Sequence, residues 1–380
     1  MMHTLTRTSD TIAVAPRSAA APGSIPDPIP LTGKSLAVFR RALLHWYDQH
    51  RRDLPWRETR DPYCIWLSEI MLQQTRVAAV LDHYRIFLKR FPNVQTLAAS
   101  SEDTVLAAWS GLGYYRRARM LHRCAQEVVQ THGGRFPGNF EALLALPGIG
   151  RYTAAAVASI AFGEAVAVVD GNVERVLQRL IGVNFNAAQI WQDAQTLLDR
   201  SRPGDFNQAM MELGATVCVP RDPRCLTCPV RQWCATRGEV PHGVGNERVP
   251  ASCQKKKQIW CALDWRDGNG NGHGDGEVRL VQRPKKASLM PGMWELPQSS
   301  EPPRPERTAA HWRTFRHSIT VTNYTVHVLR KTVLPNTALR NTSLPKPMFA
   351  AKAKWIAIDR IPQMPITGLT RKILKAGGII

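Results

Sequence analysis

Four cysteines near the middle of the chain, Cys218, Cys225, Cys228 and Cys234, are spaced C-x6-C-x2-C-x5-C. Thiolates crowded into so short a segment favour a metal site over a set of disulfides. Sulfur ligands suit zinc or an iron–sulfur cluster. A structural zinc site usually contains two CxxC pairs, whereas this segment contains one. The spacing therefore favours an iron–sulfur cluster, with a zinc ribbon or unrelated buried thiols as the alternatives.

Two carboxylates, Glu69 and Asp170, lie in contrasting sequence surroundings. Glu69 is among apolar residues on the helical run Ile65–Val80. A carboxyl group in apolar surroundings has a raised pKa and keeps its proton as a general acid. Asp170 ends an apolar run and precedes Gly171, which places it at a structural edge facing a cleft. The alternatives are a surface acid at Glu69 and a plain helix N-cap at Asp170.

A glycine-containing turn, Leu146-Pro147-Gly148-Ile149-Gly150, separates two helical stretches. Gly148 and Gly150 permit a positive φ and a close approach, so consecutive backbone N–H groups can face a phosphate. The N-terminus of the following helix adds its dipole to the same anion. The turn predicts a contact with a nucleic-acid backbone, and the alternative is an ordinary helix–helix turn.

The charge of the chain points to a polyanionic partner. The 380 residues carry a formal net charge of +20, of which +14 lies after residue 250. So basic a chain favours nucleic acid, although a merely soluble basic surface is the alternative. No apolar run approaches the roughly 18–20 residues of a membrane helix, so we expect no membrane contact. Scattered cysteines outside the central four indicate a reducing compartment.

The elements that must position these residues fall into two classes. Apolar residues three and four apart predict an all-helical region over residues 34–237, with some ten short helices. Residues 1–33 are expected to form a disordered tail, and 238–255 a linker. Residues 256–380 are β-rich and predict a separate α+β domain, in which Asp267–Gly276 forms a hairpin tip. The predicted strands are Gln258–Trp265, Glu277–Gln282, Ser318–Leu329 and Trp355–Ile358.

In this order, the glycine turn, Asp170 and the cysteine segment resemble the helix–hairpin–helix glycosylase superfamily, which includes endonuclease III. The resemblance is closer to the adenine-specific MutY family and covers most of the chain. It rests on Leu67–Thr75, on Gly111–Arg117 as a lesion-probing loop, and on Pro291–Pro297. It implies a six-helix module at about 60–165, a cluster module from about 34–59 and 166–237, and a [4Fe–4S] cluster on the four cysteines.

The resemblance assigns roles to the catalytic candidates. Glu69 would protonate adenine and later activate water, while Asp170 stays ionised and stabilises the cationic sugar. Two carboxylates in different environments suit the cleavage of an N-glycosidic bond. Tyr152 and Asn172 would support the sugar and Asp170. Tyr152 stands where bifunctional members have a lysine, and a tyrosine cannot form a Schiff base, so a monofunctional enzyme follows.

The resemblance also implies a set of DNA-reading residues, because a buried base must be flipped out of the duplex. Arg57 matches a position near the adenine pocket, with a phosphate contact as the alternative. Leu112 and Tyr114 would wedge into the gap. Further DNA-contacting candidates are Gln73, Gln74, Thr75, Leu146, Gly148 and Gly150.

Residues after the linker resemble the Nudix-like domain that is appended to the MutY family. Glu301–Ala310 contains prolines and lacks the acidic helix of a Nudix hydrolase, so we expect no pyrophosphatase activity. The family reads 8-oxoguanine with a Phe-Ser-His turn, and the corresponding residues here are Phe315, Arg316, His317 and Ser318. Either Arg316 or Ser318 would supply the donor.

These observations predict a monomeric, monofunctional adenine DNA glycosylase that acts on adenine opposite 8-oxoguanine or guanine in double-stranded DNA. An endonuclease III-like glycosylase/lyase for oxidised pyrimidines is the alternative enzyme. A non-catalytic DNA-binding protein with a structural cluster is the alternative of another class. In a bacterium the expected location is the cytoplasm, at the nucleoid, and the N-terminal segment also permits organelle targeting.

Overall fold

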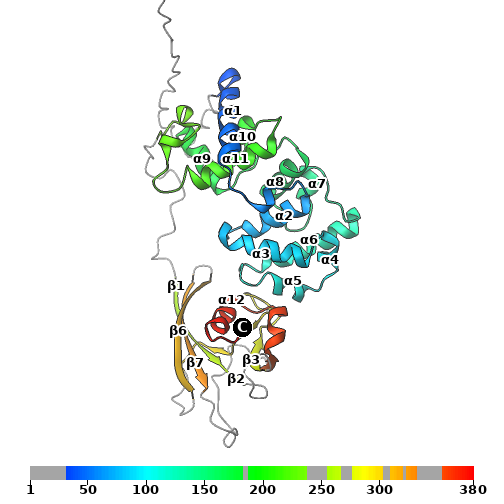
Figure 1. The fold of residues 1–380 in the computed structure, drawn as a ribbon, viewed down its shortest axis with the longest axis vertical. Coiled ribbons are helices and arrows are strands. Elements are labelled where there is room, and N and C mark those ends of the chain that lie inside the picture. Colours follow the sequence, from blue (N-terminus) through cyan, green and yellow to red (C-terminus); the bar gives the residue numbers. More distant parts are fainter. Residues whose placement is uncertain are drawn as a thin grey trace, which may run out of the picture. The chain divides into compact units, whose positions relative to one another are not determined.

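The computed structural model describes residues 31–182, 187–237, 255–266, 276–302, 309–319, 322–331 and 353–380 (Figure 1). The predicted tail and linker fall outside these ranges apart from residues 31–33 and 255, and so does the predicted hairpin tip apart from residue 276. Contacts divide the chain into a first unit, Met1–Glu69 with Phe136–Arg248, and a second unit, Ile70–Arg135 with Val249–Ile380. In the described ranges, no helix is both long and apolar enough to cross a bilayer.

The first unit is helical, as its apolar periodicity predicted. Helix α8 is alanine-rich and buried along most of its length, because small side chains let neighbouring helices approach closely. Helix α9 buries a stripe of apolar residues three and four apart, which packs with α1 and α11 in one core. The helices are α1 (Gly33–His50), η1 (Pro55–Arg57), α2 (Pro62–Leu72), α7 (Phe140–Leu144), α8 (Arg151–Phe162), α9 (Gly171–Ile181), α10 (Ala187–Leu197) and α11 (Pro203–Thr216).

The second unit begins inside α2, and its N-terminal segment contains helices α3 to α6. Asn93 and Ser101 cap α4 and α5 by accepting backbone N–H groups, as short polar residues at a helix start commonly do. Phe87 packs edge-on against Trp109 at 6.0 Å between ring centroids, which joins α3 to the end of α5. The bounds are α3 (Val77–Arg90), α4 (Val94–Ala99), α5 (Glu102–Ala108) and α6 (Arg116–His132).

The C-terminal part of the second unit is an α+β domain, which confirms the predicted fold class. One sheet has the strand order β5-β1-β7-β6, with β1 and β7 parallel, and the other joins β2, β3, β4 and β8. Helix α12 (Gly368–Ala376) lies beside the strands (Figure 1). Its Ile373 and Leu374 are buried in a core that contains residues of both sheets. The strands are β1 (Lys255–Leu263), β2 (Trp265–Arg266), β3 (Glu277–Gln282), β4 (Trp294–Glu295), β5 (Gln298–Ser299), β6 (Ala309–Ile319), β7 (Thr322–Lys331) and β8 (Lys354–Ala357).

The β-rich run predicted over Ser318–Leu329 contains parts of two strands rather than one. The structure has two antiparallel strands there, β6 and β7, with Ile319 opposite Thr322. The sequence between them, Ile319-Thr320-Val321-Thr322, contains none of the Gly, Pro or Asn residues that mark a turn. Its β-branched residues read as continuous strand, which is why the hairpin escaped prediction.

Candidate active site

Glu69 on α2 is held in a buried environment by a tyrosine. Glu69 is 5% exposed, and the Tyr152 hydroxyl on α8 donates a hydrogen bond to its Oε2 atom at 2.6 Å. Burial above all raises the pKa of Glu69 to about 7; the nearby charge of Asp170 raises it too, whereas the Tyr152 bond and Arg57 lower it. A carboxyl group with this pKa can hold a proton near neutral pH and release it to a leaving group.

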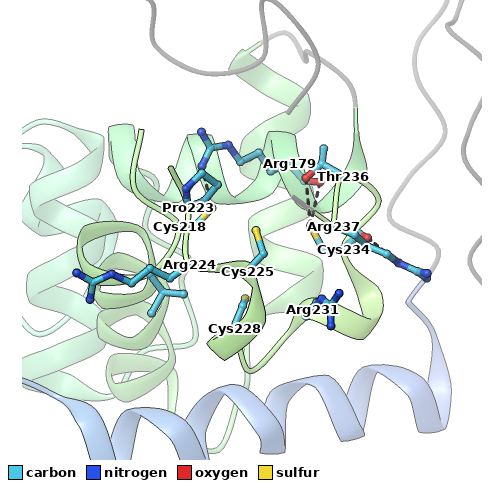
Figure 2. Close-up of a pocket in the computed structure, with 11 residues that line it drawn as sticks. Arg179, Cys218, Pro223, Arg224, Cys225, Cys228, Arg231, Cys234, Thr236 and Arg237 are labelled. Atoms are coloured by element: carbon cyan, nitrogen blue, oxygen red, sulfur yellow. Dashed lines mark hydrogen bonds between the residues drawn. The ribbon is translucent and has the colours of Figure 1, made fainter. Parts of the chain in front are cut away.

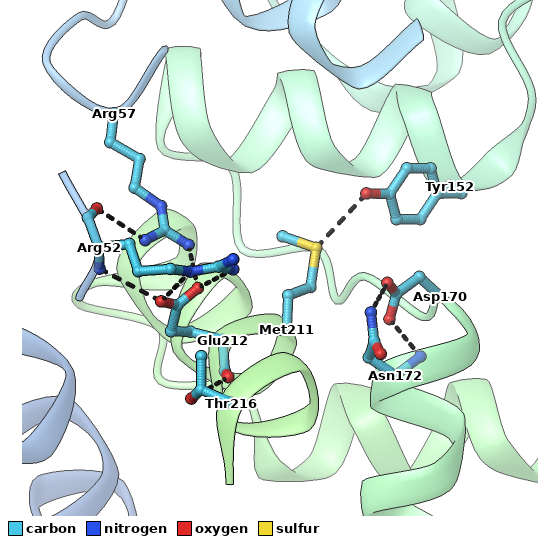
Figure 3. Close-up of polar contacts among 8 residues, drawn as sticks. All are labelled: Arg52, Arg57, Tyr152, Asp170, Asn172, Met211, Glu212 and Thr216. Atoms are coloured by element: carbon cyan, nitrogen blue, oxygen red, sulfur yellow. Dashed lines mark hydrogen bonds and ion pairs between the residues drawn. The ribbon is translucent and has the colours of Figure 1, made fainter. Parts of the chain in front are cut away.

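Asp170 is the N-cap of α9, as the alternative reading of this residue predicted. Capping is compatible with a catalytic role for the same carboxylate. One carboxylate oxygen accepts the backbone N–H groups of Asn172 at 2.9 Å and Val173 at 2.8 Å. The other accepts the side-chain amide of Asn172 at 2.9 Å. Figure 3 shows the two bonds from Asn172. With the Val173 N–H, three donors face this carboxylate at the N-terminus of α9, where the helix dipole favours an anion.

Asn172 is tied in turn to the cysteine segment through Arg175. The Nη2 atom of Arg175 donates to Asn172 Oδ1 at 2.9 Å and to the Gly214 carbonyl at 2.7 Å. Its Nε donates to the Cys218 carbonyl at 2.9 Å. Gly214 permits this crossing of α9 and α11, because a Cβ there would lie 2.6 Å from the Cβ of Asn172. Arg175 thus fixes the amide that orients Asp170.

Sequence reasoning missed a buried ion-pair network beside the tyrosine. Glu212 on α11 accepts from Arg52 Nε and from Arg57 Nη2, each at 2.7 Å (Figure 3). Burial alone would raise the pKa of Glu212, but the hydrogen bonds from both arginines lower it to about 2. The neighbouring Met211 accepts from the Tyr152 hydroxyl at 3.4 Å. A carboxylate in the apolar run Met210–Leu213 carried the same signal that singled out Glu69.

Arg57 was predicted to lie near the base pocket or on a phosphate. Its side chain is 10% exposed and is paired with Glu212, and it also donates to the Arg52 carbonyl at 3.1 Å. A guanidinium so buried and so satisfied favours the pocket over the DNA backbone.

The four cysteines line one cavity that is partly open to solvent (Figure 2). They lie after α11 on a compact segment with two 3-10 turns, η2 (Cys225–Thr227) and η3 (Arg231–Trp233). Arg179, which is 2% exposed, donates to the Cys218 sulfur at 3.4 Å and so complements thiolate charge.

The four cysteines form an all-sulfur donor set. Four thiols are ligands that an iron–sulfur cluster or a zinc ion can take. In the described residues, no three His, Cys, Asp or Glu side chains lie where they could share one metal ion.

Comparison with known proteins identifies the family. Residues 67–198 match the family described as HhH-GPD superfamily base excision DNA repair protein. The adenine DNA glycosylase of Rattus norvegicus is 44% identical over 275 residues, which are 67% of this chain and 52% of the relative. The solved structure of a thermostable thymine-DNA glycosylase is 35% identical and covers 54% of this chain and 97% of that one, with a TM-score of 0.51. This chain belongs to the HhH-GPD superfamily.

Its matches to individual relatives are partial in length. The adenine DNA glycosylase of Homo sapiens is 49% identical over 220 residues, which are 54% of this chain and 40% of the relative. The alignments with these mammalian relatives span about half the length of those proteins.

The superfamily's helix–hairpin–helix turn has one glycine with the expected conformation. Gly148 has a φ of 77°, and the Ile149 N–H bonds to the Leu146 carbonyl at 3.2 Å. The expectation for Gly150 is corrected: it is the N-cap of α8 with a φ of −91°, and a Cβ there would meet no atom within 4 Å. The backbone conformation at position 150 therefore does not require glycine. The backbone N–H groups at the start of α8 are the part of this turn that could still bind an anion.

The two predicted DNA-reading segments of the second unit are joined by Arg117, the last residue of the predicted probing loop, to which the sequence analysis gave no role of its own. Its Nη1 atom donates to the Ile70 carbonyl at 2.7 Å, and its Nη2 to Thr75 Oγ1 at 3.0 Å and to the Leu112 carbonyl at 3.2 Å. Burial lowers the pKa of Arg117 to about 10. This arginine holds the glutamine turn, Gln73–Thr75, against the tip of the probing loop, Gly111–Tyr114.

The candidates on these two segments differ in exposure. Gln74 is exposed with a φ of 56°, and Tyr114 is 49% exposed with a φ of 47°. Gln73 and Thr75 are partly buried. Leu112 is 5% exposed, and its role as a wedge stays a prediction. Of the two predicted wedge residues, Tyr114 is the one presented to solvent.

The predicted lesion-contact residues lie on a strand and not on a turn. Phe315, Arg316, His317 and Ser318 belong to β6 and pair with β7 next to its hairpin. Phe315 is 7% exposed and packs in the domain core, and its DNA contact stays a prediction. Arg316 and Ser318 are exposed and share the face opposite to Phe315 and His317. Burial, with the charge of Lys372, lowers the pKa of His317.

Proposed function

We propose that this protein is a monofunctional adenine DNA glycosylase that excises adenine opposite 8-oxoguanine or guanine in duplex DNA. The observation that carries the proposal is the hydrogen bond between Tyr152 and the protonatable Glu69, in the same unit as the charge-stabilised Asp170. Adenine is proposed as the excised base because the mammalian relatives are adenine DNA glycosylases.

The mechanism follows from the two carboxyl environments. Glu69, protonated near neutral pH, donates its proton to the flipped base, which becomes a neutral leaving group. The sugar is left with cationic character, and the ionised Asp170 stabilises that charge. Glu69, now a carboxylate, activates the attacking water. Tyr152 orients Glu69 and has no amine for a Schiff base, so the DNA strand stays intact.

Cys218, Cys225, Cys228 and Cys234 hold a [4Fe–4S] cluster in this proposal. A cluster held by these four thiolates would crosslink the segment that follows α11 and would have a structural role. Iron and sulfide analysis of the purified protein checks this assignment, and about one zinc per chain would contradict it. The protein is further proposed to act as a monomer in the compartment that holds the DNA.

The deciding experiment incubates the protein with duplexes that carry A opposite 8-oxoguanine, A opposite G, T opposite G, or an oxidised pyrimidine. The proposal expects base release from the first two, and strand cleavage only after alkali. Glu69→Gln is the control. Strand cleavage without alkali, together with borohydride trapping of an enzyme–DNA adduct, would instead show an endonuclease III-like lyase. Preferred release of T would show a thymine glycosylase, and duplex binding without any release a DNA-binding protein.

A further inference from the structure

A hydrogen-bonded contact inside the second unit joins the C-terminal domain to the residues on both sides of the probing-loop tip. The backbone carbonyl of Ile366 accepts from the Ser110 hydroxyl at 3.1 Å and from the Tyr115 hydroxyl at 3.2 Å. Arg371 on α12 donates through Nε to the same Ser110 hydroxyl at 2.9 Å. Ser110 immediately precedes the loop tip Gly111–Tyr114, and Tyr115 immediately follows it.

The contact is buried on both sides. Ser110 is 6% exposed, Tyr115 4% and Ile366 0%. A hydroxyl withdrawn from water must find its partner in the protein, so these bonds fix where the two side chains lie. Both donors converge on one acceptor, which brings the two ends of the tip to a common point.

The acceptor is itself rigidly held in the C-terminal domain. Trp294, in the element Pro291–Pro297, donates its N–H to the Pro365 carbonyl at 2.8 Å, and its own carbonyl accepts from the Thr367 N–H at 2.9 Å. The carbonyl of Ile366 therefore lies between two bonds to β4 and directly before the start of α12. The Pro291–Pro297 element thus supports the segment that carries the acceptor.

We infer that the C-terminal domain sets the position of the probing-loop tip through the Ile366 carbonyl, with Ser110, Tyr115 and Arg371 as positioning residues. Tyr114 in the tip has a φ of 47°, a conformation that non-glycine residues adopt only when the surrounding structure holds it. Arg117 extends the same support to the glutamine turn. The domain would then influence base probing mechanically, apart from any contact it makes with the opposite base.

Hydrogen exchange of the full-length protein tests the inference without DNA. The variants are Ser110→Ala combined with Tyr115→Phe, and separately Arg371→Met, with Lys375→Met on the exposed face of α12 as the charge-matched control. The readout is the exchange rate of amides in residues 109–115 divided by that of amides in α3, which belongs to the same unit, so that general destabilisation of this unit cancels. Loss of a buried hydrogen bond should raise this ratio about fivefold. An unchanged ratio in both test variants would overturn the inference.

A second measurement rests on the proposed function. Its outcome distinguishes a failure of the proposed function from a failure of the positioning role. Single-turnover base release opposite 8-oxoguanine and opposite guanine is compared in the Ser110→Ala, Tyr115→Phe protein and in Lys375→Met. The inference expects the ratio of the two rates to fall about fivefold in the test variant and to stay constant in the control. If the unaltered protein releases no adenine, the proposed function fails while the exchange result stands. Adenine release with an unaltered ratio would argue against the positioning role.

Discussion

At the scale of single residues, the site contains two carboxyl groups in contrasting environments. Glu69 is withdrawn from water, and burial raises its pKa to about 7. Asp170 is partly exposed and accepts three hydrogen bonds at the start of α9. The proposed cleavage of an N-glycosidic bond needs a proton for the base and a negative charge near the sugar, and these two environments suit the two roles.

We expect Glu69→Gln to abolish base release while duplex binding persists, because an amide cannot donate the required proton. Asp170→Asn should slow release by ~10²–10³ or more, since transition-state charge stabilisation is lost. Asparagine caps a helix as well as aspartate does, so α9 should remain intact. Single-turnover kinetics with circular dichroism as the folding control checks both. Near-normal release by either variant would show that another residue performs the chemistry.

The raised pKa of Glu69 predicts the pH dependence of base release. The acid is protonated below about pH 7, so the single-turnover rate should fall as pH rises through that value. The hydrogen bond from Tyr152 lowers the pKa of Glu69, so its removal in Tyr152→Phe should move this fall to higher pH. A rate profile from pH 5 to pH 9 measures the shift. A fall at the same pH in both proteins would mean that Tyr152 does not act on the proton of Glu69.

At the scale of helices, the first unit is organised by charged side chains that cross between elements. Glu212 on α11 gathers Arg52 and Arg57 from the segment after α1, and Arg175 on α9 reaches both Gly214 and Cys218. A buried ion pair adds little to stability when intact, but removing one partner leaves the others uncompensated. These crossings therefore fix geometry around Tyr152 and Asp170 more than they stabilise the fold.

Glu212→Gln should lower the free energy of unfolding on the order of 3 kcal/mol, because the largely buried Arg57 loses its counter-charge. The pKa of Glu212 is lowered to about 2, so its contribution is complete above pH 4.5 and is lost as pH falls toward 2. Denaturant unfolding at pH 7 and pH 3 measures the difference. Asp82→Asn, which breaks the exposed pair with Arg85, is the matched control and should change stability by less than about 1 kcal/mol.

At the scale of the whole molecule, the charge and the contacts assign different tasks to the C-terminal domain. It carries +14 of the net charge, and charge alone raises affinity for any duplex in a salt-dependent way. Discrimination between opposite bases requires specific contacts, or a correctly positioned probing loop. In the second unit, the exposed Arg316 and Ser318 are the candidates for specific contacts with the opposite base. The hydrogen bond from Ser110 to the Ile366 carbonyl is the candidate for positioning the probing loop.

Deleting the residues after Pro250 should leave glycosidic chemistry intact and erode the preference for 8-oxoguanine over guanine by ~1–3 kcal/mol. His317→Ala should reproduce part of the loss. Competition between the two duplexes measures the preference, and the slope of binding against salt should become shallower by ~0.9 for each phosphate contact removed. Full preference in the truncated protein would place recognition in Gln74 and Tyr114.

The sequence by itself determined the features that depend on local pattern. Helical and strand periodicity predicted the all-helical and α+β classes, and the cysteine spacing predicted the segment that lines the cavity in Figure 2. The apolar flanks of Glu69 predicted its raised pKa. Each of these follows from residues within a few positions of one another, where backbone geometry fixes which side chains are neighbours.

Only the tertiary structure decided which distant residues share a site. The bonds from Arg52 to Glu212 and from Ser110 to Ile366 span more than a hundred positions, and no local pattern encodes such pairs. Packing likewise buried Leu112 and Phe315 while it left Tyr114 exposed, although all three are apolar or aromatic residues in β- or loop-forming stretches. Burial is a property of the whole packed molecule, because it depends on what the rest of the chain places above each side chain.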